Sequence, residues 1–163
     1  SDLLDLGIQV RSNLGEGAVF QVQAPVGAPK PLTHPQTQEI ALNADAIVID
    51  DDPLALEALA GALRDLGMRV RACGSERELE AALNSGPSPA LLVTDLRIDG
   101  RLAGLELAQR LRPRLAPPHG VIVVTGDTAP ETLNQLKASG YGWLIKPIDP
   151  KELARAAAGA LGL

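Results

Sequence analysis

The sequence sets four apolar residues directly before three acids and a proline, in the stretch Ala46-Ile47-Val48-Ile49-Asp50-Asp51-Asp52-Pro53. A strand that ends in clustered carboxylates holds like charges together at a cost, unless a cation lies among them. Two later apolar runs end in a comparable way, in Val93-Thr94-Asp95 and in Leu144-Ile145-Lys146-Pro147. Two acidic strand ends and one lysine strand end together predict a compact site for a hard metal ion and a phosphoryl group.

Short apolar runs alternate with helical periodicity from Ala46 to the end of the chain. The predicted strands are 46–49, 68–72, 90–94, 120–124 and 142–145. The predicted helices are 53–66, 75–85, 103–112, 129–138 and 149–161. Strands separated by helices in this way are typical of the doubly wound α/β class, in which helices cover both faces of a parallel sheet. The two most hydrophobic runs, 90–94 and 121–124, are expected at the centre of the sheet.

The polar residues that follow these strands are expected to meet, because right-handed crossovers bring the carboxyl ends of parallel strands to one edge. Asp50 and Asp51 follow the first strand, Asp95 the third, Thr125 the fourth and Lys146 the fifth. Carboxylate oxygens at this density suit Mg²⁺. The sequence shows no cluster of histidine and cysteine that would favour zinc, and its two histidines fall in a predicted linker and a predicted loop.

Each of these residues also has an ordinary structural explanation. Asp50–Asp52 could be turn residues that cap the helix beginning at Pro53. Asp95 could be a loop acid, Thr125 the cap of the next helix, and Lys146 a solvated surface lysine. The joint pattern favours the functional interpretation, because four separate strand ends each carry the residue type that one phosphoryl-transfer site needs.

Over about 45–163 the chain resembles the receiver domain of two-component response regulators. The residues that carry the resemblance are Ile47-Val48-Ile49-Asp50-Asp51-Asp52-Pro53, Leu91-Leu92-Val93-Thr94-Asp95, Val121-Ile122-Val123-Val124-Thr125-Gly126 and Trp143-Leu144-Ile145-Lys146-Pro147. The resemblance implies a flavodoxin-like five-stranded sheet with strand order 2-1-3-4-5. It also implies a cis peptide bond between Lys146 and Pro147, a geometry that is essentially confined to proline.

The same resemblance implies a role for each strand-end residue. Asp95 would be the phosphoacceptor, and Mg²⁺ would be bound by Asp50, Asp51, Asp95 and the backbone carbonyl of Arg97. Thr125 and Lys146 would contact the phosphoryl oxygens, and Trp143 would be the aromatic switch residue alongside Thr125.

The function implied is phosphorelay signalling, in which Asp95 accepts a phosphoryl group from a phosphohistidine and the domain changes conformation. The partner would be a histidine kinase or a histidine-phosphotransfer domain. One alternative is a pseudo-receiver that binds a partner without being phosphorylated. A second alternative is an aspartate-nucleophile phosphatase of the haloacid-dehalogenase kind. The first motif of that class has an acid two residues past the nucleophile and then a threonine, whereas this chain continues with Pro53-Leu54-Ala55.

Some residues near the site depart from the usual family pattern or extend it. The family usually carries a proline near position 99, where this chain has Asp99. Trp143 is bulkier than the usual tyrosine or phenylalanine. Arg97 and Asp127 each lie two residues past a site residue, so we expect them to pair across the mouth of the site and slow hydrolysis of the phosphorylated form.

The N-terminal residues 1–24 predict a β-hairpin that turns at 13–17, and four prolines in 25–44 predict a linker. The hairpin resembles the last two strands of a histidine-kinase ATP-binding domain. The nucleotide-binding boxes and the kinase histidine are absent, so no ATP binding is expected. Together the two resemblances imply the C-terminal end of a hybrid sensor kinase, itself a phosphoacceptor without a kinase core. Unpaired strand edges predict that the hairpin docks on the receiver part or pairs with a second copy, giving a homodimer.

The composition limits which partners and which cellular location we expect for this protein. The 163 residues carry a net charge of −5, which argues against a nucleic-acid partner, because nucleic acid favours a basic face. A single cysteine, Cys73, fits a reducing cytosol. No run of about 18 apolar residues occurs, so no membrane contact is expected in this segment. We expect a cytoplasmic location, which leaves the parent protein free to carry a membrane anchor elsewhere.

Overall fold

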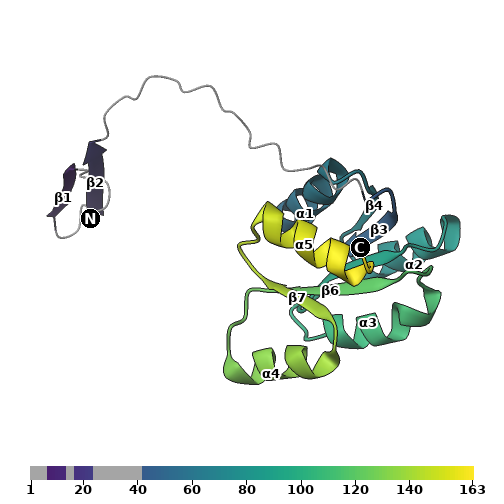
Figure 1. Ribbon diagram of the computed structural model, residues 1–163. Coiled ribbons are helices and arrows are strands. Elements are labelled where there is room, and N and C mark those ends of the chain that lie inside the picture. The colour runs from purple at the N-terminus through teal and green to yellow at the C-terminus, as the bar shows by residue number, and fades with distance from the viewer. Residues whose placement is uncertain (1–6, 14–16, 24–41) are drawn as a thin grey trace. The chain divides into compact units, whose positions relative to one another are not determined.

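The computed structural model describes residues 7–13, 17–23 and 42–163, and the chain divides into two compact units, Ser1–Gln36 and Thr37–Leu163 (Figure 1). In the first unit, β1 (Gly7–Asn13) pairs antiparallel with β2 (Gly17–Gln23), which is the predicted hairpin. Val10 lies opposite Phe20, and the two residues are 54% and 72% exposed. The predicted turn and most of the predicted linker lie outside the described residues.

The second unit alternates strands and helices along the chain. Its elements are β3 (Asp45–Ile49), α1 (Pro53–Asp65), β4 (Arg69–Cys73), α2 (Glu76–Ser85), β5 (Leu91–Asp95), α3 (Gly104–Leu111), a 3₁₀ turn (Arg112–Arg114), β6 (Gly120–Thr125), α4 (Pro130–Ser139), β7 (Gly142–Ile145) and α5 (Pro150–Ala160). The predicted boundaries differ from these by one residue at most, and only the 3₁₀ turn was not predicted. No described helix combines the length and the apolar character needed to cross a membrane.

The five strands of this unit form one parallel sheet in the order β4-β3-β5-β6-β7. Counted from β3, this is the order 2-1-3-4-5, so the flavodoxin-like topology is confirmed. Every residue of β5 and β6 is buried, and β5 is the central strand. The expectation that the two most hydrophobic runs form the middle of the sheet is also confirmed.

Helices cover both faces of this sheet (Figure 1). On one face, α1 and α5 bury Leu63 and Leu153 against Val48 and Val93 of the strands. On the other face, α2, α3 and α4 bury a second apolar layer against Ile47, Leu92 and Val123. Leucine, isoleucine and valine build both layers, as expected from an aromatic content of 2%. The two layers leave the polar carboxyl ends of the strands at one edge.

Side-chain caps fix where several helices begin. Asp52 is the N-cap of α1 and accepts hydrogen bonds from the backbone N–H groups of Leu54 and Ala55. Ser75 and Asp149 cap α2 and α5 in the same way. Such caps contribute about 1 kcal/mol each. The cap at Asp52 is the structural role considered for the acid cluster, and it leaves Asp50 and Asp51 for another purpose.

The first described residues of the second unit are packed onto it. Leu42 is buried and donates its backbone N–H to Leu66 O over 2.9 Å, and Ala44 O accepts the N–H of Arg69 over 3.0 Å. Residues 42–44, which the sequence assigns to the linker, therefore belong structurally to the α/β unit. Leu42 adds apolar area to the layer under α1, and this contact could not be read from the proline-rich composition around it.

Two helical glycines should respond in opposite ways to the same substitution. A Cβ at Gly61, inside α1, meets no atom within 4 Å, whereas a Cβ at Gly104, the first residue of α3, would overlap the backbone carbonyl of Asp95. We expect Gly61→Ala to raise the free energy of unfolding by about 0.5–1 kcal/mol. Gly104→Ala should lower it by about 1–3 kcal/mol. Urea denaturation of both variants checks the pair, and a stabilising Gly104→Ala would contradict the close packing of α3 against the end of β5.

Candidate phosphoacceptor and metal site

Three carboxylates meet at the carboxyl ends of β3 and β5. Each of Asp50, Asp51 and Asp95 offers one oxygen, and these oxygens all lie within 4.8 Å of one another. Asp50 is fully buried, Asp95 is 9% exposed and Asp51 is exposed. The convergence follows from the topology, because β3 and β5 are adjacent parallel strands. The exposed carboxylate of Asp51 thus lies beside the two buried carboxylates of Asp50 and Asp95.

Lys146 brings a positive charge to the same place from the end of β7. Its Nζ lies 2.7 Å from Asp50 Oδ2 and 3.4 Å from Asp95 Oδ2. Its backbone N–H donates to Thr125 O over 2.8 Å, and the Lys146–Pro147 peptide is cis, as predicted. The lysine side chain is 28% exposed. It is therefore not a solvated surface lysine, and it compensates a carboxylate that has no access to water.

The surroundings shift the pKa values of Asp95 and Lys146. Burial raises the pKa of Asp95, and the neighbouring Asp50 adds to this, while the charge of Lys146 acts in the opposite direction. Burial lowers the pKa of Lys146, but the hydrogen bond to Asp50 and the charges of Asp95 and Asp50 outweigh it, so its pKa is raised overall. Lys146 therefore keeps its positive charge, and this charge stabilises the carboxylate form of Asp95 beside it.

The loop after β5 holds Asp51 through a backbone hydrogen bond. Asp99 N–H donates to Asp51 Oδ2 over 3.0 Å. Ile98 and Arg101 exchange both backbone hydrogen bonds around Asp99 and Gly100, which have φ values of 51° and 73°. Positive φ at both central residues is the geometry of a type I′ turn, for which Asp-Gly is a favoured pair. A proline at 99 would supply no N–H, so the departure from the usual family pattern gives Asp51 a partner.

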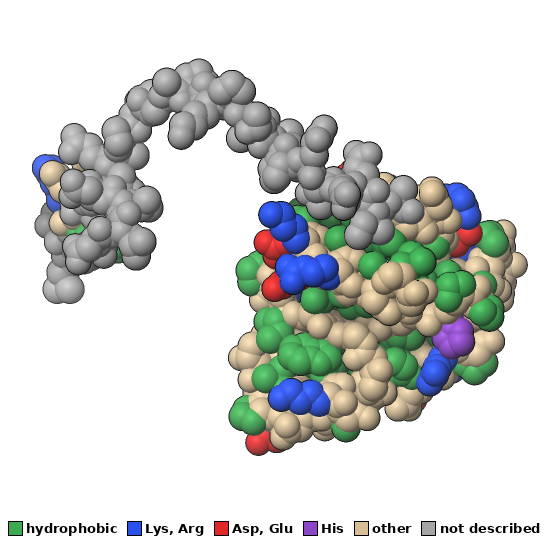
Figure 2. All heavy atoms as spheres, viewed as in Figure 1, with side chains coloured by type: hydrophobic (Ala, Val, Ile, Leu, Met, Phe, Trp, Pro, Cys, Tyr) green, Lys and Arg blue, Asp and Glu red, His purple; other side chains and the backbone are tan. Residues whose placement is uncertain are grey.

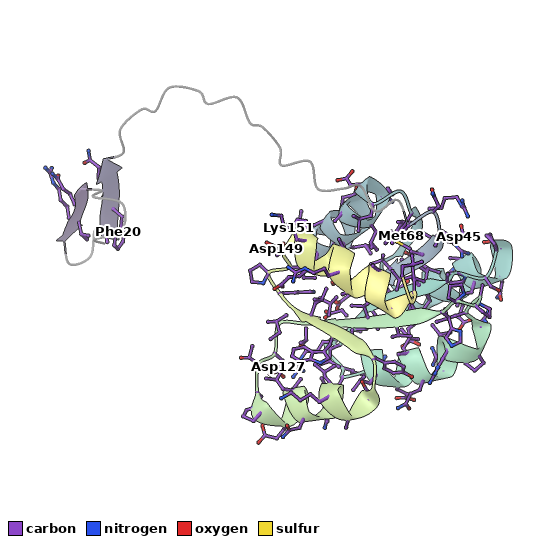
Figure 3. All side chains as sticks on the ribbon, in the orientation of Figure 1. Phe20, Asp45, Met68, Asp127, Asp149 and Lys151 are labelled. Carbon is purple, nitrogen blue, oxygen red and sulfur yellow. The ribbon has the colours of Figure 1, made fainter. Side chains whose placement is uncertain are left out.

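Thr125 lies at the end of β6 and lines the same cavity as Asp95, and its hydroxyl accepts the N–H of Asp127 over 2.9 Å. Asp127, labelled in Figure 3 in the loop before α4, accepts from Ala129 N–H and from the Thr132 hydroxyl. These hydrogen bonds, Ala129 first, lower the pKa of Asp127. Asp127 Oδ2 also lies 3.3 Å from Arg97 Nη2, so the predicted pair across the site is present.

A cavity of about 280 Å³ opens between these side chains. Asp95, Arg97, Thr125, Gly126 and Asp127 line it. The Asp95 carboxylate thus borders open space, and Arg97 and Asp127 are among the residues that line it. The capping alternative for Thr125 is wrong, because α4 has Ala129 at its N-cap and Asp127 supplies the side-chain bonds there.

Trp143 lies on β7, opposite Val123 of β6. Its side chain is half-buried and packs against the apolar layer that includes Leu136 of α4. The indole is therefore on the sheet face covered by α2, α3 and α4. It lies three residues before Lys146, which follows β7, and on the strand next to the one that ends at Thr125.

The structure brings Asp50, Asp51, Asp95 and Lys146 together, and Thr125 lines the same cavity as Asp95, whereas Trp143 is not among the residues that line that cavity. Arg97 is two residues past Asp95 with an exposed side chain, and the role of its carbonyl stays a prediction. Sequence reasoning missed the Asp99 hydrogen bond and the close approach of Gly104 to Asp95. The Asp99-Gly100 pair was a usable turn signal, whereas nothing in the sequence marks Gly104 as a contact.

Comparison with known proteins agrees with this geometry. Residues 46–158 match the family model of the response regulator receiver domain. The positive alginate biosynthesis regulatory protein of Pseudomonas aeruginosa is 34% identical over 114 residues, which cover 69% of this chain and 45% of that protein. The transcriptional regulatory protein AruR of the same organism is 32% identical over 112 residues, which cover 66% of this chain and 45% of that protein. The chain therefore matches about half the length of these relatives.

Among solved structures, the chain is similar to a response regulator receiver protein from Burkholderia phymatum. The TM-score is 0.60 at 24% identity, and the match covers 73% of this chain and 95% of that one. At this level of identity the likeness concerns the fold. It extends over nearly the whole of that protein, so the α/β unit corresponds to one complete receiver fold.

Proposed function

The chain belongs to the response regulator receiver domain family, and from this premise we propose that it accepts a phosphoryl group on Asp95 and changes conformation in a phosphorelay. The observation that carries the proposal is the position of Asp95. It ends the central buried strand, borders a cavity of about 280 Å³, and lies 3.4 Å from the Lys146 ammonium group. The proposal is tested by mass spectrometry on Asp95 after incubation with a phosphodonor and a magnesium salt.

The donor set fits a hard divalent cation. Three carboxylate oxygens lie within 4.8 Å of one another, and Mg²⁺ prefers oxygen ligands and keeps several waters. We propose that Asp50, Asp51 and Asp95, with the backbone carbonyl of Arg97, hold it. When bound, Mg²⁺ would offset the repulsion between the acceptor carboxylate and the incoming phosphoryl oxygens.

In the proposed step, an oxygen of Asp95 attacks the phosphorus of a phosphohistidine in line. The P–N bond breaks, its electron pair stays on the imidazole nitrogen, and an acyl phosphate forms. Lys146 places its ammonium group beside the acceptor oxygen and stabilises the charge on the phosphoryl group. Positioning and charge neutralisation are what phosphoryl transfer chiefly requires of a protein.

We propose that Thr125 and Trp143 convert this chemistry into a change of shape. The Thr125 hydroxyl oxygen accepts from Asp127 N–H, and its own hydrogen has only a long contact of 3.5 Å to Asp127 O. That hydrogen is available to a phosphoryl oxygen on Asp95. Movement of Thr125 toward the acyl phosphate would draw the loop after β6 inward, and the half-buried Trp143 could turn into the space left behind.

The partner would be a histidine kinase or a histidine-phosphotransfer domain, and a surface next to the site suits it. A cavity of about 380 Å³ between α1 and α5 is lined by Ala55, Ala58, Ile148 and Pro150, with Lys146 at its edge. Leu54, at the start of α1, is 83% exposed. A partner protein that packed the apolar face of a helix against this cavity would bring the histidine on that helix to the end of the sheet that carries Asp95.

The hairpin of β1 and β2 is a feature shared with the end of a kinase ATP-binding domain, which is why we propose a hybrid histidine kinase as the parent protein, cytoplasmic in this part. The net charge predicts no nucleic-acid partner. The relatives give this prediction no support, because they include a protein named as a transcriptional regulator.

We expect the Arg97–Asp127 pair to slow loss of the phosphoryl group by standing in the path of attacking water. Arg97→Ala should therefore speed hydrolysis of the phosphorylated form by about three- to tenfold, because the pair lines the cavity that the acceptor borders. Arg101→Ala is the matched control, since Arg101 is an exposed arginine of the same loop with no described carboxylate partner. The measurement is the decay of phosphoprotein in excess EDTA, and an unchanged rate in Arg97→Ala would reject the role.

We further propose that the hairpin mediates pairing with a second copy. Val10 and Phe20 face each other across β1 and β2 and are both exposed, and an isolated two-stranded hairpin is marginally stable in water. Light scattering should give the mass of a dimer for the full chain and of a monomer for a chain lacking residues 1–40. Phe20→Ser should also give a monomer, and Gln21→Ser, on the opposite face, should not. An identical monomer in all four samples would remove the proposal.

A further inference from the structure

A third cavity lies at the amino end of the sheet strands, opposite the end that carries Asp95, and its lining has a different composition. Its volume is about 570 Å³, and it is bounded by the 3₁₀ turn after α3, the start of β6, the segment from α4 into β7, and the last turns of α5. Among its lining residues are Arg112, His119, Tyr141 and Arg155. We call it the basic cavity.

The basic cavity is positively charged although the protein as a whole is acidic. Arg112 comes from the 3₁₀ turn and Arg155 from α5, and both side chains are exposed. Within residues 42–163, no aspartate or glutamate lines this cavity, and neither arginine forms an ion pair with a described carboxylate. Arg155 donates only to the backbone of its own helix, to Lys151 O at 3.3 Å. In Figure 2 a histidine side chain is visible beside a basic one on the surface of the α/β unit.

Four glycines are among the residues that line the basic cavity, namely Gly120, Gly140, Gly142 and Gly159. Gly159 is part of α5, where glycine weakens a helix, yet a Cβ there would meet no atom within 4 Å. Glycine at this position therefore serves no close packing inside the protein. It leaves the cavity open at this point of its wall.

From these observations we infer that the basic cavity is a binding site for a phosphate-bearing metabolite of nucleotide size. Arginine presents a planar set of donors that matches phosphate oxygens in pairs, so two arginines without carboxylate partners favour a phosphorylated ligand. The volume lies in the range of small-molecule pockets and exceeds the needs of a single phosphate ion. Tyr141, Val121 and Ala156 add an apolar wall for the organic part of such a ligand.

The inference is independent of phosphorylation on Asp95, and its test keeps the two apart. The test is calorimetric titration of the full chain with ADP, with pyrophosphate and with adenosine. Excess EDTA in each titration removes the divalent metal that phosphorylation of Asp95 would need. ADP should bind with a stoichiometry of one and about tenfold or more tighter than either pyrophosphate or adenosine. Absence of binding at millimolar ADP, or equal affinities for the three compounds, would overturn the inference.

Variants locate the ligand. Arg112→Gln and Arg155→Gln should each weaken ADP binding about tenfold, because each removes a charged hydrogen-bond donor. Gly159→Leu should abolish binding, since its side chain would fill the open space, while leucine favours the helix and keeps the protein folded. Lys137→Gln, an exposed charge removed from α4 outside the lining, is the control and should bind as the wild type does. Unchanged affinity in both arginine variants, or in a folded Gly159→Leu variant, would also overturn the inference.

Discussion

Replacing Asp95 with asparagine is expected to abolish the mass gain of about 80 Da that phosphorylation gives the protein. The amide cannot act as the attacking nucleophile, so the rate of phosphorylation should fall by at least about a thousandfold. The measurement is intact-protein and peptide mass spectrometry after incubation with acetyl phosphate or a phosphohistidine protein in the presence of magnesium. Because asparagine has nearly the size and shape of aspartate, the variant should fold with the same sheet.

Asp65→Asn is the matched control, since Asp65 is an exposed acid at the end of α1. It should be phosphorylated like the wild type. A mass gain that persists in Asp95→Asn would place the acceptor elsewhere. The same experiment separates the alternatives, because a pseudo-receiver would show no mass gain in the wild type, and an aspartate-nucleophile phosphatase would release inorganic phosphate continuously over many turnovers.

Replacing Lys146 with methionine should cost the protein about 3 kcal/mol of unfolding free energy. The reason is Asp50, whose carboxylate is fully buried and lies 2.7 Å from the ammonium group that the variant removes. Uncompensated buried charge is one of the few single-site changes with effects of this size. Lys146 keeps 28% of its side-chain surface exposed, so we place the loss at the low end of the range for buried pairs. Urea denaturation in EDTA measures it without interference from divalent cations.

A double-mutant cycle tests the cause. Asp50→Asn in the Lys146→Met background removes the unpaired charge and should restore about half of the lost stability or more. Phosphorylation should fall by at least about a hundredfold in Lys146→Met, because the charge beside the transferred group is gone. If Lys146→Met and its double variant are equally unstable, the loss has another origin, such as packing of the lysine stem.

Much of the fold could be predicted because this sequence is locally consistent. Runs such as 90–94 are too short and too apolar for surface helices, and the segments between them carry helical periodicity with caps at Asp52, Ser75 and Asp149. The site followed from topology, since parallel strands leave their carboxyl ends at one edge. The positions of Asp50, Asp95 and Lys146 in the sequence were therefore enough to predict that they meet.

Features that depend on packing could not be obtained in this way. The preference of Lys146 for Asp50 over Asp95, 2.7 Å against 3.4 Å, reflects which carboxylate is more deeply buried once the layers close. The basic cavity gathers residues from 112 to 160 that share no periodicity. His119 lies in a loop, as predicted, but the residues that line the cavity with it, such as Tyr141 and Arg155, are distant in sequence.

The bond between Lys146 and Asp50 joins residues 96 positions apart, one at the end of β3 and the other at the end of β7. A ribosome must therefore deliver nearly the entire domain before the two charges can meet. A prematurely terminated or clipped product that ends before β7 would carry the acids without the cation. Under the proposed function, such a product would keep Asp95 but lack the ammonium group that assists transfer to it, so it would compete poorly with intact copies for phosphoryl groups.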